Sequence, residues 1–119
     1  MDFHGVVIAE GLEDPTLVNA LRVHRAEITD EGHAADYEGT VGRWHLYWVE
    51  VDDDAIARIQ RNTKHGWYSH FWDGDRLLIV YNDAKFEVSR RDRSSWSQAI
   101  EHGQRQGIPS DELDFVPDE

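Results

Sequence analysis

The chain has 119 residues and a formal net charge of −12, from 24 acidic and 12 basic side chains. Hydrophobic residues make up 39% and aromatic residues 11%, a composition typical of a packed globule and not of a disordered chain. The chain contains no cysteine, which excludes disulfides, thiol nucleophiles, iron–sulfur clusters and Cys-based zinc sites. The acidic balance repels nucleic acid and anionic membranes, so we expect neither as a partner.

The N-terminus, residues 1–4, lacks the basic start and apolar run of a signal peptide. The longest apolar stretch, residues 77–81, is far shorter than the roughly 20 residues of a membrane span. Together these features predict a cytoplasmic protein.

The first part of the chain predicts strands at residues 3–10 and 22–29, separated by a short helix. Asp14-Pro15 marks the start of that helix, because Asp can cap and Pro is tolerated at the first helical position. Leu17, Val18 and Leu21 then share one helical face. Residues 30–42, rich in glycine and acids, predict a long loop.

The strongest β pattern of the chain lies at residues 43–51. Strand alternation places Trp44, Leu46 and Trp48 on one face and His45, Tyr47, Val49 and Val51 on the other. Both faces are largely apolar or aromatic, which predicts an interior strand.

Asp52-Asp53-Asp54 predicts the start of a helix, because acids favour the positive end of the helix dipole. This helix is expected to run to residues 64–65 and to stop at Gly66. Runs at residues 67–72, 76–82 and 85–89, separated by turn sequences at 73–75 and 82–84, predict a three-stranded meander.

Ser95 with Gln98 predicts a capping box that opens a helix to about residue 106, where Gly107 ends it. Residues 110–112 predict one further turn, which returns Leu113 and Phe115 to the core. Residues 116–119 are expected to form a frayed tail.

The resulting order β-α-β-β-α-β-β-β-α predicts one α+β domain over residues 1–119, with a mainly antiparallel sheet of five to six strands and two to three helices. The best topology is a ferredoxin-like core, the split β-α-β plan. In such a plan we expect the helices to cover one sheet face. The uncovered aromatic face would then be an interface or a ligand groove.

No catalytic motif is present: the chain lacks a Gly-rich phosphate loop, Gly-x-Ser-x-Gly and His-Glu-x-x-His. The seven histidines show no metal-ligand spacing, so we expect no metal and no cofactor. Helix capping explains the acids at 52–54, and a turn explains the three arginines at residues 90, 91 and 93. The sequence therefore leans against an enzyme.

Two histidines lie within strands that carry aromatic side chains on the same face. His45 shares its face with Tyr47, and His70 shares its face with Tyr68 and Trp72. If the two faces coincide, these five residues would line a ligand pocket, a partner surface or a proton-transfer pair. The alternative is amphipathic packing, with the ring nitrogens bonded to backbone or water.

Four short segments carry a resemblance to known proteins. They are residues 3–6, which begin Phe3-His4-Gly5; residues 66–71, which begin Gly66-Trp67-Tyr68; Phe86-Glu87-Val88; and residues 107–115, which begin Gly107-Ile108-Pro109. In these segments the chain resembles a family of small, stand-alone bacterial and archaeal α+β proteins of unknown function. The resemblance implies a compact, freestanding domain of this length, and it transfers no activity and no catalytic residues.

Two functions follow as hypotheses. The first is a small binding or interaction module that forms a homodimer through its aromatic sheet face. The alternative is a small-molecule-binding domain or enzyme that uses a pocket lined by His, Tyr and Trp, with the ligand unknown.

Overall fold

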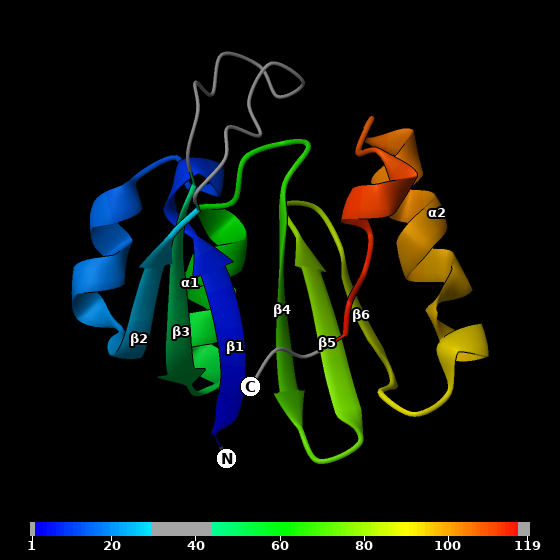
Figure 1. The fold of residues 1–119 in the computed structure, drawn as a ribbon, viewed down its shortest axis with the longest axis horizontal. Helices are drawn as coiled ribbons and strands as arrows, with labels where there is room; N and C mark the ends of the chain where they lie inside the picture. The colour runs from blue at the N-terminus through cyan, green and yellow to red at the C-terminus, as the bar shows by residue number, and fades with distance from the viewer. Residues whose placement is uncertain (1, 30–43, 117–119) are drawn as a thin grey trace.

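The computed structural model describes residues 2–29 and 44–116. The predicted loop at 30–42 and most of the predicted tail, residues 117–119, lie outside these ranges. The described strands and helices confirm the α+β class with an antiparallel sheet (Figure 1). The strands are β1 (Phe3–Ile8), β2 (Arg22–Ile28), β3 (His45–Val51), β4 (Tyr68–Asp73), β5 (Arg76–Tyr81) and β6 (Lys85–Ser89). The helices are α1 (Asp53–Arg61) and α2 (Ser97–Arg105), with 3-10 helices η1 (Ala9–Gly11), η2 (Pro15–Ala20), η4 (Arg93–Trp96) and η5 (Ser110–Glu112).

The six strands form one sheet in the order β2-β3-β1-β4-β5-β6, and every neighbouring pair is antiparallel. β3 lies between β2 and β1, so its predicted interior position is confirmed. β1 in turn lies between β3 and β4, so the first four strands interleave in the way that a split β-α-β plan requires. Assignment to the ferredoxin-like folds stays a prediction.

The helices cover both faces of the sheet, so the expectation that they cover a single face is wrong (Figure 1). On one face, α1 and η2 pack through Ile56, Ile59 and Leu17; we call it the α1 face. On the opposite face, α2 and the segment after it pack over β4, β5 and β6; we call it the α2 face. The α1 face carries Phe3, Val7, Val49, Val51, Phe71, Leu78 and Val80, and the α2 face carries Trp72, Leu77, Ile79 and Tyr81.

Helix α1 begins as predicted but ends earlier than expected. The Asp52 side chain accepts a hydrogen bond from the backbone N–H of Ala55 at 2.8 Å, which caps the first turn. The helix ends at Arg61 and not at residues 64–65, because Asn62 bonds the segment before η2 instead of continuing the helix. Its amide nitrogen donates to the carbonyl of Asp14 at 2.8 Å, and its carbonyl accepts from Glu13 at 2.7 Å.

Helix α2 lacks the predicted capping box. Asp92 caps the 3-10 helix η4 by accepting from the backbone N–H of Ser94, and α2 continues from η4 at Ser97. The Ser95 hydroxyl donates to the carbonyl of Asp92 and so is already used within this turn. The predicted end at Gly107, which has a φ of +87°, is confirmed, as is the return of Leu113 and Phe115 to the core.

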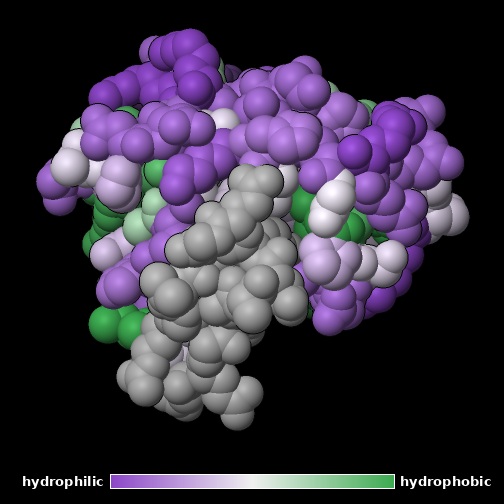
Figure 2. Space-filling model, turned by 90° about the horizontal axis from the view of Figure 1, so that it is seen from above, coloured by the Kyte–Doolittle hydropathy of each residue, from purple (hydrophilic) through white to green (hydrophobic). Residues whose placement is uncertain are grey.

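On the face of the molecule seen in Figure 2, most of the described residues are hydrophilic. Within the described ranges, the exposed large hydrophobic residues are Val23, Ile28 and Val116, and the first two lie on the edge strand β2. A bulge at His24 and the flanking charged side chains interrupt this edge. Both features discourage pairing of the edge with another sheet.

Strands β1 and β4 join the two halves of the sheet through only three residue pairs, from His4–Trp72 to Val6–His70. Gly5 and Phe71 form the central pair. A Cβ atom on Gly5 would lie 2.1 Å from Phe71 Cδ1 and 2.8 Å from the carbonyl oxygen of His70. Only glycine therefore allows the Phe71 ring to lie directly against β1.

We expect Gly5→Ala to destabilise the protein by about 1–3 kcal/mol, because the added methyl overlaps a ring and a backbone oxygen that cannot both move away. Urea unfolding measures this cost. In a Phe71→Leu background the same substitution should cost less, since the ring is gone and only the backbone contact remains. A change within about 0.5 kcal/mol for Gly5→Ala alone would show that the junction tolerates a side chain.

Tyr81, at the end of β5, anchors α2 to the sheet. Its fully buried hydroxyl donates to the carbonyl oxygen of Ala99 at 2.6 Å. Burial raises the pKa of Tyr81 well above the ordinary tyrosine value, so the phenol stays neutral in the folded protein.

We expect Tyr81→Phe to cost about 0.5–1.5 kcal/mol at neutral pH, the usual net value of one hydrogen bond. Because the pKa is raised in the folded state, the contribution of Tyr81 is fully present below the unfolded value of about 10 and falls as the pH rises above it. The change in the free energy of unfolding between about pH 8 and about pH 11 should therefore be smaller for Tyr81→Phe than for the parent protein. Half-buried Tyr47 on β3 supplies the matched control, Tyr47→Phe.

Candidate ligand pocket

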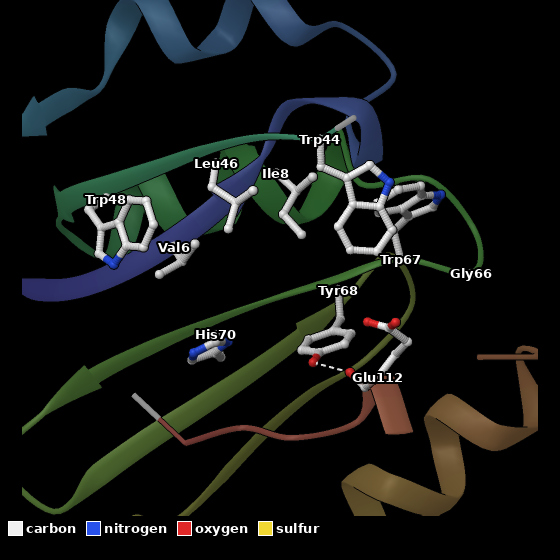
Figure 3. Close-up of a pocket in the computed structure, with 10 residues that line it drawn as sticks. All are labelled: Val6, Ile8, Trp44, Leu46, Trp48, Gly66, Trp67, Tyr68, His70 and Glu112. Atoms are coloured by element: carbon white, nitrogen blue, oxygen red, sulfur yellow. Dashed lines mark hydrogen bonds between the residues drawn. The ribbon is translucent and has the colours of Figure 1, made fainter. Parts of the chain in front are cut away.

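A concave pocket of about 160 Å³ lies on the α2 face, where β1 and β4 diverge (Figure 3). The β1–β4 ladder stops at Val6 and His70, although β1 continues to Ile8 and β4 begins at Tyr68. Side chains of both strands beyond this point face the opening. The lining is Val6, Ile8, Trp44, Leu46, Trp48, Gly66, Trp67, Tyr68, His70 and Glu112.

The aliphatic part of the lining comes from the two interior strands β1 and β3. Val6 pairs with Trp48, and Ile8 pairs with Leu46, so alternation sends all four side chains to the same face. Val6, Ile8 and Leu46 are only half-buried although their strands are interior. This part of the α2 face therefore keeps accessible apolar surface.

Two tryptophans close one end of the pocket. Trp44 and Trp67 lie in an edge-to-face contact, with ring centroids 5.3 Å apart. Gly11 fixes the place of Trp67, because a Cβ atom there would lie 2.8 Å from Trp67 Cε3. Gly66, with a φ of +87°, makes the sharp turn just before Trp67.

The polar groups of the lining lie on the β4 side. The Tyr68 hydroxyl donates to the backbone carbonyl of Glu112 at 2.5 Å, which ties η5 to β4. The Glu112 side chain projects from η5 towards the space between Tyr68 and Trp67 (Figure 3). The His70 ring lies between those of Tyr68 and Trp72, with centroids 6.3 and 5.6 Å away.

The structure separates the five residues singled out in the sequence. Tyr68 and His70 line the pocket, and Trp72 lines an adjoining groove with His4, Gly5, His24 and Trp48. Tyr47 packs on the α1 face against the core, and His45 belongs to the same alternation. Val6 pairs with both Trp48 and His70, so the His70 side chain lies on the same sheet face as Trp48. Tyr47 and His45 point to the opposite face, and the two histidines therefore do not converge.

His45 has a structural partner at the end of β3. Its ring Nδ1 lies 2.7 Å from Glu10 Oε2, and its backbone N–H donates to Glu10 Oε1 at 2.6 Å. The pair holds η1 against β3, so the ring has a structural role, although its partner is a carboxylate and not the backbone or water of the packing alternative.

Sequence reasoning missed most of the lining, namely the aliphatic residues of β1, the Trp44–Trp48 face of β3, Trp67 and Glu112. The alternation had already placed Trp44, Leu46 and Trp48 together on one strand face. The pattern did not show how that face joins β4 through β1, because this depends on the register between segments at least 38 residues apart.

Comparisons with protein-family models, with curated proteins and with solved structures find no match for this chain. Within residues 2–29 and 44–116, no group of three or more His, Asp or Glu side chains is arranged to hold a metal ion. No helix in the same ranges is long and apolar enough to cross a membrane.

Proposed function

We propose that this protein binds a small molecule in the pocket between β1, β3 and β4. The observation that carries the proposal is the incompletely buried apolar surface of Val6, Ile8 and Leu46, which lie on two interior strands and are bordered by aromatic rings. Ligand pockets typically combine a mainly apolar lining with a few polar groups that fix orientation. Here His70 and Glu112 supply those groups.

The size of the pocket restricts its ligand. A volume of about 160 Å³ is close to that of a cavity of about 150 Å³ known to accept benzene in an engineered protein. We therefore infer a compact ligand, or a compact group of a larger one, with substantial apolar surface. The described lining holds no serine or threonine nucleophile, so the proposal is limited to binding.

Three of the lining residues are tryptophans, so their intrinsic fluorescence reports on binding directly. We expect members of a library of compact apolar and ring-bearing fragments to shift this fluorescence and to raise Tm. Leu46→Trp fills the pocket and should abolish both responses while the protein stays folded. Ile28→Trp is the matched control, because Ile28 is 55% exposed on β2 and pairs with His45, away from the pocket.

The proposal fails if no fragment binds the parent protein, or if hits bind Leu46→Trp as well as they bind Ile28→Trp. In the second case the fragments occupy another surface.

Self-association is a second candidate, and the exposure of every residue of β2, including Val23 and Ile28, favours it. A second copy would extend the sheet along this edge, a different contact from the predicted aromatic face. The bulge and charges of β2 oppose such pairing, so we rank it below ligand binding. A light-scattering mass equal to one chain at micromolar concentration would exclude it.

A further inference from the structure

We propose that the ligand of this pocket carries an alkylated ammonium group, which is recognised by the aromatic rings and by the Glu112 carboxylate. The inference rests on the proposed binding function and deepens it by naming the chemical class of the ligand.

Aromatic rings make up much of the lining. Trp44, Trp67 and Tyr68 lie at the end of the pocket where Glu112 enters, and Trp48 lies towards the other end (Figure 3). The face of an indole or phenol ring carries negative potential and attracts cations, most strongly for tryptophan. The sheet already contains one such contact, since the Arg25 guanidinium lies 4.1 Å from the centroid of the Trp48 ring.

Glu112 supplies the formal negative charge. Its backbone carbonyl is held by the Tyr68 hydroxyl at 2.5 Å, which fixes the residue at the pocket edge. The described part of the lining includes Glu112 but no lysine or arginine, so no permanently charged cationic side chain of that lining neutralises it. The net charge of −12 adds a long-range attraction for cations.

The apolar walls select an alkylated cation over a bare one. A primary ammonium presents three donors that each need an acceptor, and a metal ion needs at least four ligands. In the described lining, Glu112 supplies the carboxylate acceptor. Methyl groups need no acceptors, and they would bury Val6, Ile8 and Leu46 while the diffuse charge faces the rings.

The sharpest test compares two molecules of the same shape that differ in charge. Choline and its neutral carbon isostere, 3,3-dimethyl-1-butanol, are titrated against the full-length protein, with tryptophan fluorescence and calorimetry as readouts. We expect choline to bind about fivefold or more tighter than the isostere. Trimethyl-lysine amide is a third arm, and binding tighter than that of choline would identify a modified side chain as the source of the group. Either cation supports the inference only if it binds more tightly than the neutral isostere.

A pair of neighbouring acids provides the variant control. Glu112→Gln removes the charge but keeps the backbone carbonyl that Tyr68 bonds, and it should weaken choline binding about threefold or more. Asp111→Asn changes net charge equally, yet Asp111 is exposed and does not line the pocket. It should leave choline binding unchanged at physiological salt.

Equal or tighter binding of the neutral isostere would overturn the inference and leave the proposed binding function standing. No binding of any cation at millimolar concentration would also overturn it, and the fragment screen then decides the binding function separately. Equal weakening by Glu112→Gln and Asp111→Asn would show a general charge effect, and so would contradict a specific carboxylate contact.

Discussion

The close approach of Gly5 to Phe71 is the contact on which the shape of this sheet depends. Strands β2, β3 and β1 carry α1 on one face, whereas β4, β5 and β6 carry α2 on the other. Only three residue pairs of β1 and β4 connect these halves, and Phe71 crosses from β4 into the core beneath α1. The ring can do so because Gly5 has no side chain to exclude it. The two halves therefore share one core through a short and tightly packed junction.

The same short junction creates the pocket. Had the β1–β4 ladder continued past Val6 and His70, Ile8 and Tyr68 would face each other across a closed sheet. Divergence of the strands instead separates an aliphatic wall on β1 and β3 from a polar wall on β4. Each wall belongs to a different half of the sheet, so the width of the pocket depends on the angle between β1 and β4 at their junction.

Local patterns predicted the elements well because each element depends mainly on neighbouring residues. The two-faced alternation of residues 43–51, the Asp52 cap and the turn at Gly74, with its φ of +60°, are all short-range signals. The errors arose where distant contacts decided the outcome. Asn62 leaves α1 to bond Asp14, and α2 packs on the face opposite α1 because the residues following it return over β4 and β5. No periodicity within a segment contains that information.

The candidate site could not be predicted from the sequence for a related reason. Titratable side chains are the usual sequence signal of a site, but in this protein the apolar side chains define the pocket. His45 carries a proton-transfer group, and the structure gives it a structural partner in Glu10. Val6, Ile8 and Leu46 are ordinary interior-strand residues whose burial would contribute about 25 cal/mol for each Å² removed from water. They are left incompletely buried because, among the described residues, α1 lies on the opposite face and α2 packs over β4 to β6. A ligand with apolar groups would recover that burial, so the incomplete cover of an interior strand is itself the physical argument for binding.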